Sequence, residues 1–178
     1  MEELLLVIPS REHEAMAREY QAEFREYRSV LHGVSGLDKA DDYGQWLNML
    51  ADMRDAGRVP DGYVSADTYF LIRKADNRLL GMINIRHRLN EYLLREGGHI
   101  GYSIRPTERR KGYASAMLRM ALDRCRELGI DRVLVTCDKN NIASAGTIRK
   151  NGGVLENEVV IADSAEVLQR YWIRLELP

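Results

Sequence analysis

Residues 99–137 limit the fold of this chain most strongly, because they read as a strand, a turn, a helix and a second strand. Residues 99–105 form a largely apolar run that ends at Pro106. Residues 115–128 carry apolar side chains at helical spacing, and Gly129 follows them as a stop signal. Residues 132–137 are apolar and rich in β-branched side chains. This order predicts two parallel strands of one sheet, joined by a right-handed helical crossover.

The turn that opens this helix has an unusual charge. It consists of Arg109, Arg110, Lys111, Gly112, Tyr113 and Ala114. A helix N-terminus carries about half a positive charge, so each cation placed there costs about 0.3–1 kcal/mol unless an anion offsets it. Free backbone N–H groups and a glycine that permits close approach are suited to phosphate. The turn therefore favours an anion site, and a solvated basic turn is the alternative.

The rest of the chain adds helices and antiparallel strands. We expect strands at residues 4–8, 68–72, 79–86, 154–161 and 167–175, and helices at residues 11–28, 41–55 and 143–150. Residues 88–98 read as a polar connection. The apolar side chains of the helix at 41–55 predict either core or the wall of a substrate pocket, and the basic run at 86–88 predicts a strand-end surface.

Composition excludes several classes of protein. The 178 residues carry a net charge of −1, which gives no overall attraction to nucleic acid or to an anionic membrane. The two cysteines, Cys125 and Cys137, have no metal-site or disulfide spacing, so we expect reduced thiols, no metal and a cytoplasmic location. The apolar run at 4–8 is too short to span a bilayer. The length suits a single domain over residues 1–178.

Together these motifs resemble the GNAT superfamily of acyl-CoA-dependent N-acyltransferases. The signature of that family, Arg/Gln-x-x-Gly-x-Gly/Ala, is matched by residues 109–114, and its aliphatic-x-Pro strand end is matched by Ile104, Arg105 and Pro106. The resemblance covers the chain from about residue 64 onward, whereas the first 60 residues match only in element order. It implies an α/β fold with a mixed, mostly antiparallel sheet of about seven strands, a central βαβ unit and helices on both faces.

The resemblance also implies a cofactor site for acetyl-CoA. The N–H groups of residues 110–114 would bind the diphosphate, with Arg109 at the start of the motif. The backbone of Ile104 would pair with the pantetheine arm and polarise the thioester carbonyl, in a gap where the fourth and fifth strands separate. A second family segment is matched from Asn141 to Gly152, so Asn141 would bind the pantetheine and Ser144 would lie near the cofactor. As an alternative, both residues are common helix N-caps.

The catalytic groups are less defined by this resemblance. Many members have a tyrosine that protonates the leaving thiolate four residues after the position of Ser144, but this chain has Ile148 there. The proton would come from water, from the amine or from another side chain, for which Tyr113 and Tyr171 are candidates. His99 is the first candidate for a general base, since its ordinary pKa suits proton transfer near neutral pH. The remaining alternatives are Asp138 and Glu96 as bases and Cys137 as a covalent relay.

We therefore expect an enzyme that transfers an acetyl group from acetyl-CoA to a primary amine by direct attack in a ternary complex. The acceptor would be a small-molecule or peptide amine, with residues 10–57 shaping its pocket. Neither nucleic acid nor a membrane is expected as a partner, and edge strands near the C-terminus would allow a homodimer. A non-catalytic acyl-CoA-binding or sensor module of the same fold is the alternative. A site for a different nucleotide ranks last, because no Walker or dinucleotide glycine motif is present.

Overall fold

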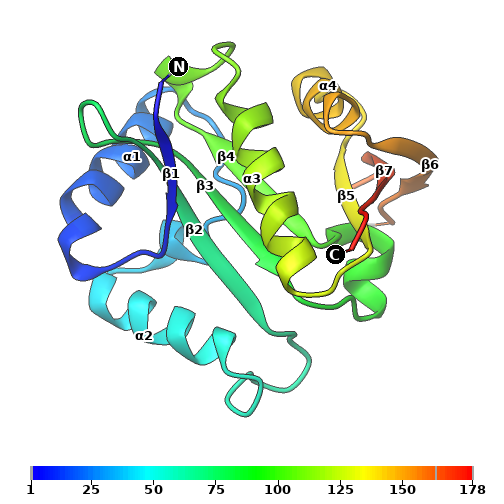
Figure 1. Ribbon diagram of the computed structural model, residues 1–178, viewed down its shortest axis with the longest axis horizontal. Coiled ribbons are helices and arrows are strands. Elements are labelled where there is room, and N and C mark those ends of the chain that lie inside the picture. The colour runs from blue at the N-terminus through cyan, green and yellow to red at the C-terminus, as the bar shows by residue number, and fades with distance from the viewer. Residues whose placement is uncertain (1, 163, 178) are drawn as a thin grey trace.

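The computed structural model describes residues 2–162 and 164–177, which build one seven-stranded sheet (Figure 1). The strand order is β1-β2-β3-β4-β5-β7-β6. The strands span β1 Leu4–Val7, β2 Ala66–Arg73, β3 Arg78–Arg86, β4 Ile100–Ile104, β5 Arg132–Asp138, β6 Val154–Val160 and β7 Val167–Arg174. Every neighbouring pair is antiparallel except β4 and β5, which are parallel. The mixed, mostly antiparallel sheet expected from the sequence is confirmed.

Within the described residues, four α-helices cover the two faces of this sheet. They are α1 Glu14–Glu26, α2 Tyr43–Arg54, α3 Tyr113–Glu127 and α4 Ile142–Lys150. Side chains of α1 and α2 pack with Phe70 and Met82 in one apolar cluster. Side chains of α3 and α4 pack with Leu71 and Ile83 in a second cluster on the other face. Residues of β2 and β3 thus pack alternately into two apolar cores, one on each face, as expected for a sheet that is covered on both sides.

The observed elements match the expected ones closely, with two differences. The segment 88–98, expected to be an irregular connection, contains a π-helical turn at Leu93–Gly97. The side-chain oxygen of Asn90 accepts the N–H of Leu93 at 2.9 Å and starts this turn. The helix expected at 11–28 begins instead as a 3-10 turn at Arg11–His13. None of the described helices is both long enough and apolar enough to cross a membrane.

The parallel strands β4 and β5 separate soon after they meet. They share a single bridge, between Ile100 and Val135. Just before it, the N–H of His99 donates to the carbonyl of Leu134 at 2.7 Å. Beyond Ile100 the facing edge of β4 has no strand neighbour among the described residues, whereas its other edge stays paired to β3 as far as Ile104. The fold therefore contains an open gap between two adjacent strands.

Candidate active site

The turn before α3 presents free backbone N–H groups. Arg110 and Gly112 both have left-handed backbones, with φ of 63° and 89°. The first helical hydrogen bond runs from Ala116 N–H to the carbonyl of Gly112 at 3.1 Å. The N–H groups of residues 113–115 therefore have no acceptor within the helix. Left-handed residues at such a turn gather successive N–H groups into a concave anion site.

Glycine at position 112 is explained by its backbone angle. A Cβ added there would meet no atom within 4 Å, so crowding does not require glycine. The φ of 89° is what favours glycine, because residues with a side chain adopt this region only at a cost of roughly 1–2 kcal/mol.

Two of the three cations in the turn already have partners within the protein. Lys111 Nζ lies 2.9 Å from a carboxylate oxygen of Glu108. Arg109 Nε donates to the carbonyl of Ile104 at 3.1 Å, and its guanidinium lies over the ring of Phe24. Arg110 is exposed and forms no ion pair among the described residues. Lys111 and Arg109 thus support the turn itself through an ion pair and a stacking contact, and cofactor binding by the three cations stays a prediction.

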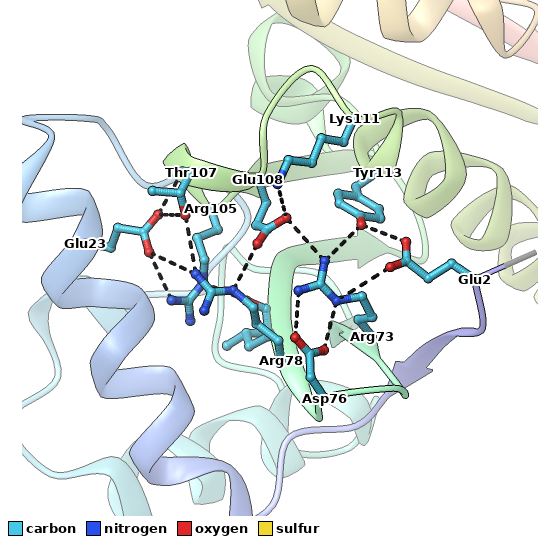
Figure 2. A network of polar contacts seen from close by, with 11 residues as sticks. Glu2, Glu23, Arg73, Asp76, Arg78, Arg105, Thr107, Glu108, Lys111 and Tyr113 are labelled. Atoms are coloured by element: carbon cyan, nitrogen blue, oxygen red, sulfur yellow. Dashed lines mark hydrogen bonds and ion pairs between the residues drawn. The ribbon is translucent and has the colours of Figure 1, made fainter.

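A buried carboxylate beneath the turn holds it in place (Figure 2). Glu108 is 5% exposed and contacts Lys111, Arg73 and Arg78, the last at 3.1 Å. Burial alone would raise the pKa of Glu108, but the hydrogen bond from Lys111 and the two arginine charges outweigh it, so the pKa lies below its usual value. Glu108 is therefore ionised near neutral pH and couples the turn to β2 and β3.

The first residue of α3 belongs to the same network. The hydroxyl of Tyr113 donates to Glu2 at 2.7 Å and accepts from Arg73 at 3.0 Å. Figure 2 shows these groups beside Glu108, below the turn. Tyr113 thus anchors the helix start through its side chain, and its hydroxyl is engaged on the side of β1 and β2.

Helix α1 fixes the other end of the turn. Glu23 accepts the N–H of Thr107 at 2.9 Å and forms an ion pair with the buried Arg105 at 3.0 Å. Arg105 also donates to the carbonyl of Leu79 at 2.8 Å. The segment that follows β4 is therefore clamped between α1 and the sheet, which gives the turn a defined shape before any ligand arrives.

The gap between β4 and β5 exposes backbone groups. Neighbouring residues of a strand point their N–H and C=O groups toward opposite edges. The N–H of Arg105 donates to Leu80 of β3 at 2.8 Å, so the groups of Tyr102 and Ile104 face the gap. The carbonyl of Ile104 is occupied by Arg109. Among the described residues, the register of β5 pairs no residue with Tyr102 or Ile104, so these groups are the candidates for binding a ligand.

Three side chains meet across this gap. The hydroxyl of Tyr102 lies 2.9 Å from Ser144 Oγ at the start of α4. Burial raises the pKa of Tyr102 to about 12, with the hydrogen bond to Ser144 acting in the opposite direction. Cys137 lies beside them, and burial raises the pKa of its thiol. A buried thiol that stays protonated is a poor nucleophile, so the geometry does not favour a covalent relay at Cys137.

Asn141 and Ser144 lie at the start of α4, directly after β5. Asn141 caps α4, since its side-chain oxygen accepts the N–H of Ser144 at 3.1 Å. The capping alternative is therefore confirmed for Asn141. Ile148, which replaces the family tyrosine, is fully buried in the core.

His99 lies buried where β4 and β5 meet. Its Nδ1 accepts the N–H of Leu134 at 2.9 Å. Burial and the nearby charge of Arg86 lower the pKa of His99 to about 4. With Nδ1 occupied, the proton of the neutral ring lies on Nε2, so no ring lone pair is free to accept a substrate proton. Catalysis by His99 stays a prediction, and this geometry favours a role in joining the two strands.

The other expected proton-transfer candidates also have partners within the protein. Tyr171 is fully buried and bonds Arg149 and Gln169. Asp138 accepts the N–H of Asn140, and Glu96 pairs with Arg95.

A pocket of about 610 Å³ lies on the face of the sheet that α2 covers. We call it the acceptor pocket; it is lined by Gly33, Ser35, Met49, Leu50, Met53, Gly62, Tyr63, Val64, Ala66, Thr68, Asn84, Arg86, Asn90, Tyr92 and Leu93. Its inner end touches β4, because a Cβ on Gly33 would lie 2.1 Å from the carbonyl oxygen of Gly101. The acceptor pocket thus reaches β4, and the opposite edge of β4 faces the gap between β4 and β5. The expectation that the helix at 41–55 supplies core or pocket wall agrees with Met49, Leu50 and Met53.

Comparison with known proteins adds the family. Residues 3–154 match the Acetyltransferase (GNAT) domain family. The chain belongs to the GNAT family of acetyltransferases. No curated protein matches this GNAT enzyme in sequence. The resemblance read from residues 104–114 and 141–152 is therefore confirmed, and with it the assignment as an acyltransferase.

Solved structures share the fold of this GNAT enzyme at low sequence identity. The ribosomal-protein-S5-alanine acetyltransferase of Vibrio fischeri is 15% identical, with a TM-score of 0.74 over 98% of this chain and 94% of that one. RimL, a ribosomal L7/L12 α-N-protein acetyltransferase in complex with coenzyme A, is 16% identical, with a TM-score of 0.70 over 97% and 94%. The dodecameric spermidine N-acetyltransferase of Vibrio cholerae is 16% identical, with a TM-score of 0.64 over 96% and 93%. At this identity the likeness concerns the fold.

Sequence reasoning missed two parts of the site. Tyr102 was not singled out, although it lies two residues before Ile104 in the same strand and so shares its edge. Glu108 was also missed, although it stands directly before the basic turn. The alternation of residues along the strand could have pointed to Tyr102. Glu108 could not be found in this way, because Arg73 and Arg78 come close to it only in the folded structure.

Proposed function

We propose that this enzyme transfers the acetyl group of acetyl-CoA to a primary amine by direct attack in a ternary complex. The observation that carries the proposal is the gap between β4 and β5, which has free N–H groups at one end and the acceptor pocket behind β4. These features match the polarity of acetyl-CoA, whose diphosphate is anionic and whose pantetheine arm carries amides. The site would hold the two reactants on opposite sides of one strand.

The diphosphate would bind the N–H groups of residues 110–114, with the exposed Arg110 adding a positive charge. Anions are stabilised at helix N-termini by such groups. The pantetheine would pair with the open edge of β4 like an added strand, using the N–H of Ile104 and the groups of Tyr102. The amide of Asn141 would bind it from the other side of the gap.

The thioester would lie near Tyr102, because the preceding Gly101 is the residue that Gly33 and Arg86 of the acceptor pocket approach. The Tyr102 N–H would donate to the carbonyl oxygen and stabilise the charge that develops on it. The amine nitrogen attacks the carbonyl carbon, the C–S bond breaks, and the amide product forms. The sequence-based expectation placed this N–H donor near Ile104. The proposal places it at Tyr102, the preceding residue of β4 that faces the same edge.

The leaving thiolate would be stabilised by the Tyr102 hydroxyl, which lies beside Ser144 across the gap. The proton that the attacking nitrogen loses ends on the sulfur, so acetyl-CoA and amine give amide and free coenzyme A. No dedicated base is required if the amine binds neutral, since orientation of the two reactants supplies much of the rate.

Thiol release tests this proposal directly. We expect free coenzyme A to accumulate when the protein is mixed with acetyl-CoA and a panel of primary amines, together with an amine that gains one acetyl group in mass. Tyr102→Phe should lower kcat roughly tenfold without changing the KM for acetyl-CoA, because a hydrogen bond to a charged group is worth about 1.5–3 kcal/mol. Tyr27→Phe, on an exposed tyrosine of the α1 end, is the matched control.

Binding of acetyl-CoA without thiol release, across the whole panel, would favour the non-catalytic module instead. An unchanged kcat in Tyr102→Phe would remove that hydroxyl from the mechanism while leaving the transfer reaction intact.

A further inference from the structure

The acceptor pocket contains an arginine with no acidic partner. Arg86 was expected on a strand-end surface, but it lines the pocket and is only partly exposed. Its Nη1 donates to the carbonyls of Gly97 at 3.0 Å and Gly98 at 3.2 Å. Among the described residues no carboxylate lies within ion-pair distance of it, whereas the adjacent His87 does pair with Asp67 at 2.9 Å. The pocket therefore has an uncompensated positive charge.

This charge lies at the reacting end of the pocket. Arg86 Nη2 is 3.6 Å from the place that a Cβ on Gly101 would occupy. The two carbonyl contacts of Nη1 fix the guanidinium in that position. Gly101 directly precedes Tyr102, near which the thioester is proposed to lie. An anion bound to Arg86 would thus be held close to the attacked carbonyl.

The rest of the lining fits a small molecule that is partly apolar. The polar groups Ser35, Thr68 and Asn84 are linked by hydrogen bonds of 2.8 and 3.1 Å. The apolar side chains gather elsewhere in the pocket: Met49, Leu50, Met53, Val64 and Leu93. The lining contains no aspartate or glutamate. A polycation would find no counter-charge in the pocket and would face Arg86.

We propose that the acceptor is a free amino carboxylate with an apolar side chain, whose carboxylate pairs with Arg86. The inference rests on the acetyl transfer proposed above and names its substrate class. In an α-amino acid the amine and the carboxylate share one carbon atom. A carboxylate held by the guanidinium therefore brings the amine within a few ångströms of Gly101 and Tyr102. The apolar side chain would then occupy the region of Met49, Met53 and Leu93.

Partial burial of the charge favours this selection. A guanidinium that has lost much of its water gains more from a carboxylate than it would at the surface, because planar bidentate contacts are available to both groups. An uncharged amide in the same position leaves the charge unpaired, which is costly. The pocket should thus discriminate between an amino acid and its amide, which are nearly equal in size.

The test compares leucine, methionine and phenylalanine, each with its own carboxamide, and includes spermidine. Initial rates of thiol release give kcat/KM for each acceptor. We expect at least one amino acid to exceed its amide by roughly tenfold or more, and spermidine to be the poorest acceptor. Arg86→Met should lower kcat/KM for that amino acid about 100-fold and leave its amide within about threefold. Arg86→Lys keeps the positive charge but loses the planar guanidinium that can contact both carboxylate oxygens. It should therefore retain part of the preference for the amino acid over its amide.

Several results would overturn the inference. A wild-type preference for the amides or for spermidine contradicts it, and so does an equal loss for acid and amide in Arg86→Met. Thiol release with amines that lack a carboxylate, and none with the amino acids, would reject this substrate class but keep acetyl transfer. No thiol release with any acceptor would reject acetyl transfer itself, and this inference with it.

A measurement on the wild-type protein covers the case in which Arg86→Met does not fold. The protein saturated with coenzyme A is titrated by calorimetry with the same pairs of amino acid and amide. Binding of an amino acid at least tenfold tighter than its amide supports the inference, and equal affinities reject it.

Discussion

Replacing Arg110 by glutamate is expected to weaken acetyl-CoA binding roughly 100-fold, because a charge-assisted contact is lost and a negative charge is placed at the anion site. Arg110 is suited to the test, since it is exposed and has no ion-pair partner among the described residues. Its loss should therefore leave the fold intact. Calorimetric titration of wild-type and variant protein with acetyl-CoA at equal salt measures the effect.

Arg174→Glu provides the control with the same change of charge. Arg174 is exposed at the end of β7 and neighbours Arg132, beyond the far end of α3. Helix α3 is roughly 20 Å long, so this position is remote from the turn. We expect its affinity to change less than about threefold, since charges beyond a Debye length are screened. Equal losses in both variants would mean that net charge, and not the turn, controls binding.

Glu108→Gln is expected to lower the free energy of unfolding by about 3 kcal/mol, because removing one partner of a buried ion pair leaves buried charge uncompensated. Arg73, Arg78 and Lys111 all lose their shared carboxylate. The turn before α3 should loosen as well, with weaker acetyl-CoA binding. Urea unfolding at pH 7, followed by circular dichroism, measures the change.

The same carboxylate predicts a pH dependence. The pKa of Glu108 lies below its usual value of 4.5 in the folded protein, so its contribution to stability is fully present above that pH. It is lost as pH falls from about 4.5 through the folded pKa. Wild-type and Glu108→Gln protein should therefore differ most near pH 7 and converge in acid. Glu127→Gln, which removes an exposed ion pair with Arg124, should cost less than about 1 kcal/mol. A Glu108 variant as stable as this control would contradict the buried network.

Much of the fold could be predicted from local patterns in the sequence. The run from residue 99 to residue 137 predicted the parallel pair and its crossover helix, because Pro106, Gly112 and Gly129 mark where each element starts or ends. The turn before α3 could be predicted for the same reason, since glycine at a left-handed position has a local cause. The π-helical turn at 93–97 was not readable, because it depends on the cap supplied by Asn90.

Long-range contacts explain the features of the site that could not be predicted from the sequence. The three basic residues of the turn looked like free charges in the sequence, yet Lys111 finds Glu108 and Arg109 finds Phe24 only after folding. Arg86 looked like part of an exposed basic run, yet its guanidinium is held by the carbonyls of Gly97 and Gly98 only after folding. His99 looked like a base, but its ring is occupied by a backbone group 35 residues away. Side-chain partners set by tertiary packing are invisible to spacing and composition.

The central claim is that β4 and β5 hold acetyl-CoA between them, with the diphosphate on the turn before α3. A crystal structure with coenzyme A measures this directly. We predict diphosphate oxygens within hydrogen-bond distance of N–H groups of residues 110–114, and pantetheine amides on the edge of Tyr102 and Ile104. Coenzyme A bound elsewhere, with the gap still bridged by Tyr102 and Ser144, would contradict the account.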